Sequence, residues 1–159
     1  MYRTGIGFDV HQLAAGRSLI IGGVDINHPK GLLGHSDADV LVHAVMDAIL
    51  GALALGDIGQ HFPDTDSKYH EADSLELLSL VQGLAAEKGF ACVNIDSIIM
   101  AEKPKMNPHI LEMRTNLAAV LKIKTDQVSI KATTTERLGL IGREEGIAAQ
   151  AIVLLQSTI

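Results

Sequence analysis

The chain has 159 residues, of which 47% are apolar and 20% are charged, with a formal net charge of −6 and no tryptophan. This length suits one compact domain with a real core, and the composition is that of an ordinary soluble globular protein. The acidic balance argues against a general nucleic-acid-binding surface, so we expect no nucleic-acid partner. An acidic protein that handles an anionic substrate must gather positive charge locally, from metal ions, basic side chains and helix N-termini.

The chain shows no targeting or membrane signal. Its first residues, MYRTGIGFDVHQL, lack the apolar run of a signal peptide. The most apolar stretch, residues 40–55, is interrupted by His43 and Asp47 and is too short to cross a bilayer. Cys92 is the only cysteine, which excludes an internal disulfide and is typical of a reducing compartment. We therefore expect a cytoplasmic protein without a membrane partner.

The predicted secondary structure alternates between strands and helices. In chain order we expect a strand over 2–10, hairpin strands over 19–21 and 24–26 around Gly22-Gly23, and helices from Ser36 to about Leu53 and from Asp73 to Gly89. A strand over 90–100, a helix from Pro108 to about Leu121 and strands over 128–133 and 147–156 follow. Because no repeat or linker divides the chain, we predict one domain over residues 1–159. Helices stacked on one face of a mixed sheet, an α+β sandwich, accommodate this order of elements.

Two long connections, residues 56–73 and 133–146, do not fit the pattern of regular elements. Long connections inside a compact domain are usually functional or disordered. Both lie beside the polar motifs described next, so we expect a functional role for both.

Asp9 and His11 are two residues apart on a predicted strand, so their side chains emerge on the same side. His43 lies inside the first predicted helix. Two imidazoles and one carboxylate suit a catalytic Zn²⁺, which takes three protein ligands and leaves a fourth position open. A strand-end hydrogen bond produces the same D-x-H spacing, so the pair by itself does not decide for a metal.

His43 has a carboxylate one helical turn away on either side, Asp39 and Asp47. Metal-bound histidines normally donate their second N–H to such an acceptor, and Asp47 is our candidate for that role. A histidine satisfied on a polar helix face has the same neighbours, and Asp39 can serve as a helix cap alone.

A second group of residues has the character of an anion site. His35 precedes a helix cap, where backbone amides of Ser36 and Asp37 point outward and suit a phosphate. Residues 131–136, KATTTE, offer hydroxyls for phosphate oxygens and a carboxylate for a hard cation such as Mg²⁺, although threonines also favour strands. Arg143 is a candidate anion clamp or a simple surface arginine. The 101–107 loop follows a strand and precedes a helix, as nucleotide-binding loops do.

These segments together resemble the cyclodiphosphate synthase family, which forms 2-C-methyl-D-erythritol 2,4-cyclodiphosphate. The matching motifs are GFDVH at 7–11, GLLGHSDADVLVHAVMDAILGA with LGDIG and FPDTD from 31 to 66, KPKM at 103–106, and KATTTERLG with GREEGI from 131 to 147. The resemblance covers essentially the entire chain in order.

The resemblance implies a metal-dependent phosphorus–oxygen lyase of the non-mevalonate isoprenoid pathway. Such an enzyme cyclises 4-diphosphocytidyl-2-C-methyl-D-erythritol 2-phosphate and releases CMP. The resemblance also implies a ferredoxin-like sandwich that assembles as a homotrimer, with active sites between subunits. A split site explains why no single region of the sequence looks like a complete pocket.

The family's roles transfer to matching positions of this sequence. Asp9, His11 and His43 match Zn²⁺ ligands, Glu136 matches the residue that approaches Mg²⁺ or Mn²⁺, and His35 and Thr134 match residues that stabilise the transition state. Substrate contacts match Val10, Ser36, Asp57, Ile58, Gly59, Phe62, Pro63, Asp64, Thr65, Asp66, Ala101, Glu102, Lys103, Pro104, Lys105, Met106, Asn107, Thr133, Thr135, Leu140 and Arg143, in addition to the metal and transition-state positions.

The sequence departs from the family pattern in two places. Leu140 stands where many relatives have Phe, and Glu144-Glu145 follows Arg143, which puts an isoprenoid ligand on the trimer axis in doubt. His70-Glu71 replaces a common Lys-Gly in a loop beside the site. Two other functions use the same residues: a phosphohydrolase with a metal-bound water, and a non-catalytic zinc-stabilised nucleotide-binding module, which requires a fourth protein ligand.

Overall fold

A computed structural model describes residues 1–159. Its main sheet has five strands in the order β4-β1-β7-β5-β6, namely β4 (Lys30–Leu32), β1 (Tyr2–Ala15), β7 (Gly146–Ser157), β5 (Phe90–Met100) and β6 (Val128–Thr133). Only β5 and β6 pair in parallel, and every other neighbouring pair is antiparallel. The predicted mixed sheet is therefore confirmed, with mostly antiparallel pairing.

A separate hairpin is formed by β2 (Leu19–Ile21) and β3 (Val24–Ile26), as the sequence predicts. Its two turn residues, Gly22 and Gly23, have φ angles of +59° and +70°. Both values lie in the left-handed region that a two-residue type I′ turn requires and that glycine enters without strain.

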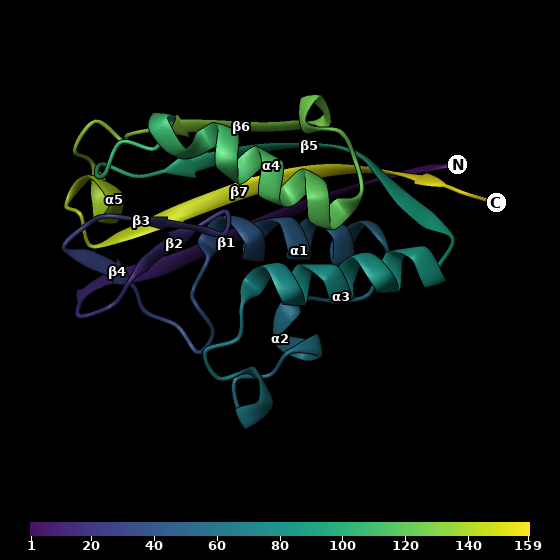
Figure 1. Cartoon of the computed structure of the whole chain (residues 1–159), viewed down its shortest axis with the longest axis horizontal. Helices are drawn as coiled ribbons and strands as arrows, with labels where there is room; N and C mark the ends of the chain where they lie inside the picture. Colours follow the sequence, from purple (N-terminus) through teal and green to yellow (C-terminus); the bar gives the residue numbers. More distant parts are fainter.

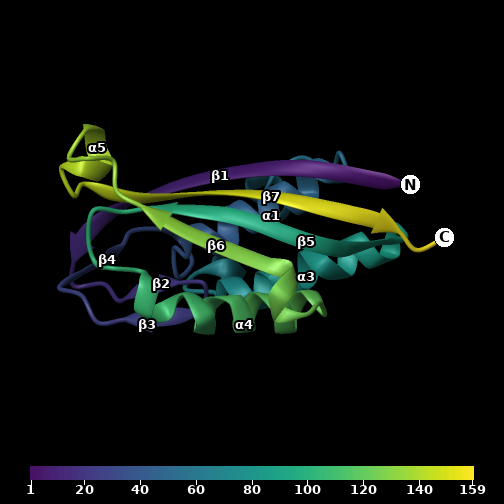
Figure 2. The same cartoon turned by 90° about the horizontal axis from the view of Figure 1, so that it is seen from above.

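Three long helices gather on one side of the sheet (Figures 1 and 2). They are α1 (Val40–Ala52), α3 (Ser74–Glu87) and α4 (Ile110–Leu121). Helix α1 lies directly on β1 and β7, and α3 packs between α1 and α4. The buried apolar residues fill the space between these helices and the sheet. No helix combines the length and the apolar character needed to span a membrane.

The closest contact between layers is that of α1 with β1, and it depends on glycine. A Cβ atom on Gly5 would lie 1.9 Å from the carbonyl oxygen of Ala48, and one on Gly7 would lie 1.9 Å from that of Ala44. Because neither glycine has a side chain, the helix backbone rests on the strand backbone. The same face of β1 continues to Asp9 and His11, so this contact sets their distance from α1.

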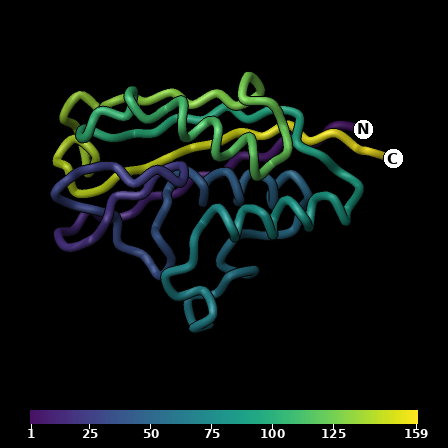
Figure 3. The backbone as a smooth tube through the Cα atoms, in the orientation of Figure 1, coloured from purple at the N-terminus to yellow at the C-terminus, as the bar shows by residue number.

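Strands β1, β5 and β6 run in the same direction and end on the same side of the molecule, opposite the two chain termini (Figure 3). Across the sheet, Asp9 pairs with Ala149, Ala149 with Ile99, and Ile99 with Ala132. Three interstrand spacings of about 4.8 Å therefore separate Asp9 from Ala132, roughly 14 Å in all.

Two predicted boundaries are wrong. Helix α1 begins at Val40 with Asp39 as its N-cap, rather than at Ser36, because Ala38 has a φ of +56° and interrupts the helical path. Strand β1 continues past residue 10 to Ala15, since it keeps pairing first with β7 and then with β4.

The two long connections contain short elements that the sequence did not reveal. The first holds α2 (Ile58–His61) and a 3₁₀ turn (Ser67–Tyr69), and the second holds α5 (Gly139–Gly142). Further 3₁₀ turns cover Asn107–His109, before α4, and Thr125–Gln127, before β6.

Candidate metal centre and active site

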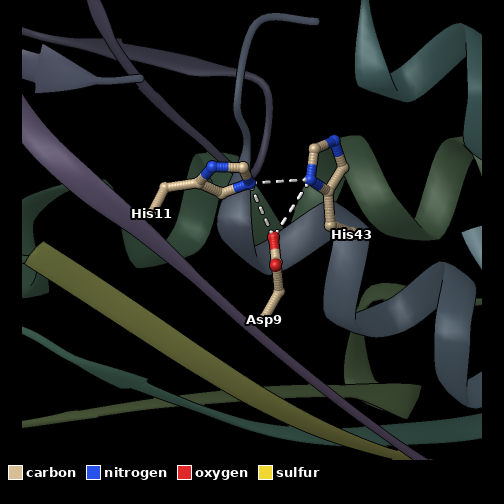
Figure 4. Close-up of side chains that lie close together, drawn as sticks. All are labelled: Asp9, His11 and His43. Carbon is tan, nitrogen blue, oxygen red and sulfur yellow. Dashed lines mark hydrogen bonds and ion pairs between the residues drawn. The ribbon is translucent and has the colours of Figure 1, made fainter. Parts of the chain in front are cut away.

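The side chains of Asp9, His11 and His43 converge on one point (Figure 4). Asp9 Oδ2 lies 2.9 Å from His11 Nε2 and 3.0 Å from His43 Nδ1, and the two ring nitrogens are 3.2 Å apart. Strand β1 supplies the first two residues and α1 the third, so residues 34 positions apart in the chain meet here.

Asp39 holds α1 in place beside β1. Its buried carboxylate accepts hydrogen bonds from the backbone N–H of Val42 within the helix and from Gly22 and Gly23 in the β2–β3 turn, at 3.1, 2.9 and 2.7 Å. The residue therefore caps the helix and ties it to the hairpin, and its side chain is not a partner of His43.

The hydrogen bonds around His11 fix its tautomer. His11 Nδ1 lies 2.7 Å from the carbonyl oxygen of Leu33. A carbonyl only accepts, so Nδ1 carries the proton and, in the neutral ring, Nε2 presents a lone pair to Asp9.

The tautomer of His43 follows from its hydrogen bond with Ser74, which in turn is hydrogen-bonded to Asp37. Ser74 Oγ donates a short hydrogen bond to the carboxylate of Asp37, whose other oxygen accepts from Ser74 N at 3.0 Å. Since the Ser74 proton is used there, its oxygen accepts from His43 Nε2 at 3.0 Å. Ser36 Oγ lies 3.2 Å from the same nitrogen. His43 Nδ1 is therefore unprotonated in the neutral ring.

When both rings are neutral, the three convergent atoms all present electron pairs, which repel one another unless a proton or a metal cation lies between them. In a tetrahedral site with bonds of about 2.0–2.1 Å, neighbouring ligand atoms are roughly 3.3 Å apart. The distances of 2.9–3.2 Å observed between these atoms are close to that value. The residues present therefore fit a bound metal ion with three protein ligands.

The negative charge of Asp9 also favours metal binding. Burial, the largest single influence, raises the pKa of Asp9, but the hydrogen bonds and charges of His11 and His43 together outweigh it and lower the pKa to about 2. Asp9 is therefore an anion at neutral pH. For His11 burial lowers the pKa, and the hydrogen bond and charge of Asp9 more than compensate, so the pKa rises above its usual value.

A cavity of about 280 Å³ lies beside the cluster. It brings together nine of the predicted site residues, namely Asp9, His11, His35, Ser36, His43, Ile58, Gly59, Phe62 and Asp64, with Gly34, Met46, Tyr69 and Leu77. Asp57 caps α2 at its edge, and the carbonyl oxygen of Asp66 lies 3.2 Å from His35 Nε2. The first long connection therefore forms one wall of the cavity.

A second cavity, of about 190 Å³, lies at the ends of β5 and β6. It is lined by Ala101, Glu102, Pro104, Lys105, Met106, Asn107, Ala132, Thr133 and Thr134. From the strand register, this cavity lies about three strands away from the metal cluster of the same chain. One chain therefore carries two separate cavities at the same end of the sheet.

Several predicted residues lie outside both cavities. Glu136 is exposed in the turn after β6 and does not belong to the metal cluster. Val10 points to the opposite face of β1, where it lines an open depression with Leu140. Arg143 forms a two-point ion pair with Glu145, with distances of 2.9 and 3.2 Å. Lys103 pairs with Glu144 at 3.3 Å.

Asp47 does not hydrogen-bond to His43. Its carboxylate accepts from the backbone N–H of Ile58 at 2.8 Å and so fixes the start of α2, while the second nitrogen of His43 faces Ser36 and Ser74. The sequence does not reveal that Ser74 contacts His43 directly and that Asp37 contacts it through Ser74. Both residues lie in helix-capping patterns, and capping alone accounts for their presence there.

Comparison with known proteins places the chain in a family. The model of the YgbB family matches residues 2–156. A protein of Desulfitobacterium hafniense named 2-C-methyl-D-erythritol 2,4-cyclodiphosphate synthase is 63% identical over 155 residues, which are 98% of each chain. The chain belongs to the YgbB family of cyclodiphosphate synthases.

Solved structures of YgbB family members have the same fold. The bifunctional IspDF protein of Campylobacter jejuni superposes with a TM-score of 0.95 at 46% identity, over 99% of this chain and 42% of that longer one. A CDP complex of IspF from Plasmodium falciparum gives a TM-score of 0.87 at 34% identity, over 99% of this chain and 97% of that one. The α+β architecture of this YgbB family chain is therefore shared by both.

Proposed function

We propose that this chain converts 4-diphosphocytidyl-2-C-methyl-D-erythritol 2-phosphate to 2-C-methyl-D-erythritol 2,4-cyclodiphosphate, with release of CMP. The convergence of Asp9, His11 and His43 in a cavity with His35 and Ser36 is the observation that carries the proposal. The 63% identity to a cyclodiphosphate synthase and the CDP bound to a structural relative support it. We further propose that residues 1–159 form one synthase domain with a ferredoxin-like sandwich.

Asp9, His11 and His43 would hold Zn²⁺ and Glu136 would hold Mg²⁺ or Mn²⁺, and these cations supply charge neutralisation and polarisation of diphosphate oxygens. The chain itself has to bind and align the substrate. In our proposal the cytidine occupies the cavity at residues 101–107 and Thr133 of one subunit, and the distal phosphate of the diphosphate and the 2-phosphate reach His35 and Ser36 of a neighbouring subunit. We also assign to Thr134, which lines the second cavity, a hydrogen bond to an oxygen of the reacting phosphate.

The reaction needs no strong base, because the second pKa of a phosphate monoester is about 6 and the 2-phosphate is already largely ionised at neutral pH. An oxygen of the 2-phosphate attacks the phosphorus of the distal phosphate, the phosphate of the diphosphate that lies further from cytidine. One P–O bond forms, the bond to the bridging oxygen breaks, and CMP leaves with the electron pair. The barrier is charge repulsion: two unit charges ~4 Å apart cost about 4 kcal/mol at an effective dielectric constant of 20. That energy corresponds to roughly three decades in rate.

We also propose that the chain assembles as a homotrimer in which two neighbouring subunits complete each active site. The separation of the two cavities across one sheet supports this, since a single diphosphate cannot reach both. The outer face of the sheet supports it as well, because it exposes large apolar side chains at Tyr2, Ile6, Phe8, Val10 and Ile152. Exposed patches of this kind mark interaction surfaces.

The deciding experiment incubates the protein with the cytidyl diphosphate substrate and Mg²⁺ and follows the products by ³¹P NMR. We expect CMP and a cyclic diphosphate, and we expect neither from protein treated with a chelator. A linear methylerythritol phosphate in place of the cyclic product would favour a metal-dependent phosphohydrolase. Binding without any turnover would favour the non-catalytic nucleotide-binding module.

A further inference from the structure

His35 lines the metal cavity, and both ends of one short 3₁₀ turn, Ser67–Tyr69, contact its ring. Asp66 is the N-cap of this turn and His70 is its C-cap. The carbonyl oxygen of Asp66 lies 3.2 Å from His35 Nε2. The ring of His70 meets that of His35 edge to face, with centroids 5.3 Å apart and planes at 80°. The His35 imidazole therefore has two different contacts with a single segment.

The two contacts restrict different motions of the His35 ring. The hydrogen bond limits where Nε2 lies, but the ring can still turn about its bond to Cβ, because torsions of this kind are broad. A neighbouring ring at nearly a right angle opposes that rotation, since edge-to-face packing is an arrangement that aromatic pairs prefer. His70 therefore supplies the constraint on the ring plane that the hydrogen bond lacks.

His70 is itself held beside His35 by backbone hydrogen bonds. The N–H of Glu71 donates to the carbonyl oxygen of His35 at 2.8 Å, and the N–H of Asp37 donates to that of Ala72 at 3.2 Å. Glu71 has a φ of +57°, in the left-handed region, where a residue with a side chain stays only if its surroundings hold it. The contact between the two rings is therefore part of a junction between residues 35–37 and 70–72, although the His70 side chain is exposed.

The same contacts leave one nitrogen of His35 free. A carbonyl oxygen only accepts, so Nε2 carries a proton and donates it to the carbonyl of Asp66. Nδ1 has no hydrogen-bond partner within the chain. Because His35 lines the cavity that holds the metal cluster, Nδ1 is the ring nitrogen that remains for a ligand. In the protonated ring Nδ1 donates, and an imidazolium N–H forms a strong, charge-assisted hydrogen bond to a phosphate oxygen.

We propose that His70 is a positioning residue: its ring, together with the carbonyl of Asp66, fixes the plane of the His35 imidazole and so presents Nδ1 to the distal phosphate of a cytidine diphosphate. The identity of the ligand rests on the proposed function. His70 does not line the cavity and does not itself touch the substrate. It is also one of the positions at which the sequence departs from the family pattern.

The test compares His70→Ala with His70→Phe and with a matched control, Ser67→Ala, in the zinc-loaded protein. Phenylalanine keeps a ring that packs edge to face, and Ser67 belongs to the same turn but is exposed and does not contact His35. CDP and CMP are titrated by calorimetry, because only CDP carries the distal phosphate. We expect His70→Ala to weaken CDP binding about three- to tenfold, the usual effect of losing one aromatic pair, and to leave CMP binding within about twofold. His70→Phe and Ser67→Ala should leave both affinities within about twofold of wild type.

A spectroscopic readout separates the positioning of His35 from a general loosening of the loop. With ¹⁵N-labelled histidine, the neutral His35 ring of wild type should be the tautomer protonated at Nε2, and CDP should shift its Nδ1 resonance. In His70→Ala the two ring-nitrogen resonances should move toward the average of the two tautomers, and the shift caused by CDP should shrink. Ser67→Ala should give the wild-type spectrum.

Unchanged CDP affinity in His70→Ala, an equal loss of CMP affinity, or the same CDP loss in His70→Phe or in Ser67→Ala would each overturn the inference. A wild-type protein that binds CDP but releases no CMP from the full substrate would contradict the proposed function alone, because the comparison of CDP with CMP does not require turnover.

Discussion

Ser74 connects the carboxylate of Asp37 to the imidazole of His43. Because Asp37 can only accept, the Ser74 hydroxyl must donate to it and must accept from His43 Nε2. The lone pair of His43 is thereby directed at Asp9 and His11 before any ligand arrives. The hydroxyl is completely buried, so no water replaces it at low cost.

We predict that Ser74→Ala weakens zinc binding by about 10- to 100-fold, the usual effect of removing a group that orients a metal ligand. The dissociation constant is measured by competition with a chelator of known affinity. Ser97→Ala is the control, since Ser97 is also a buried serine but donates to the carbonyl oxygen of Ser129. Equal zinc affinity in Ser74→Ala and wild type would show that the serine does not set the tautomer.

Glu136 is exposed and lies apart from the metal cluster of its own chain. We predict that Glu136→Gln retains full zinc content and loses most of its Mg²⁺-dependent turnover, since an amide is a much weaker ligand for a hard cation than a carboxylate. Zinc is measured by atomic absorption, and CMP release is measured against Mg²⁺ concentration. An unchanged dependence on Mg²⁺ would remove Glu136 from the site.

At the scale of elements, the distance between β1 and α1 decides whether the three metal ligands meet. Gly5 and Gly7 let the backbone of α1 rest on β1, and Asp39 ties the N-terminus of α1 to the β2–β3 turn. Any side chain at either glycine would meet a helix carbonyl group rather than a flexible side chain. A side chain at either position could therefore be accommodated only by moving the backbone of α1 or β1.

We predict that Gly7→Ala destabilises the protein by about 3 kcal/mol, the upper end of the cost of overpacking, because its Cβ would meet the carbonyl oxygen of Ala44 at 1.9 Å. Thermal unfolding measures the effect, and zinc affinity should fall with it as His43 moves away from Asp9. Gly83→Ala is the opposite control: no atom lies within 4 Å of its Cβ position in α3, so the substitution should stabilise by about 0.5–1 kcal/mol. A Gly7→Ala protein as stable as wild type would mean that α1 and β1 can separate freely.

At the scale of the whole molecule, the helices cover one face of the sheet and leave the other uncovered (Figure 2). Ile6 and Phe8 on that open face are 61% and 56% exposed. Their alternation with Gly5 and Gly7 shows that β1 turns its glycines toward the core and its large apolar residues outward. That orientation suits a sheet that other copies of the chain cover, as in the proposed homotrimer.

We predict that Phe8→Asp converts the assembly to single chains, because a carboxylate would have to be buried without a partner. Sedimentation should show the mass fall from three times 16.9 kDa to the mass of one chain. Turnover should be lost while zinc binding persists, since each chain keeps its three metal ligands. Leu80→Asp, on the exposed surface of α3, is the control and should leave mass and turnover unchanged. A trimeric Phe8→Asp protein would argue against this face as the interface.

Much of the chain's architecture follows from local patterns. The strand over residues 90–100, the Gly22-Gly23 turn and the helix capped by Asp73 are set by propensity and capping among neighbouring residues, so the sequence predicts them correctly. The predicted start of α1 was wrong because the sequence offers two capping residues three positions apart, Ser36 and Asp39. Only the contact of Asp39 with Gly22 and Gly23 decides between them.

By itself the sequence determined the three long helices and most of the strands, the placement of Asp9 and His11 on one side of a strand, and the resemblance to the family. Only the tertiary structure decided which groups surround His43, since Ser36, Ser74 and Asp37 reach it through contacts between distant segments. It also decided which face of β1 is buried, because alternation fixes two faces without saying which one meets the helices. For Asp9, His11 and His43, spacing left a metal site and a simple hydrogen bond both open, the family resemblance implied zinc, and the convergence of the three side chains favours a bound metal ion.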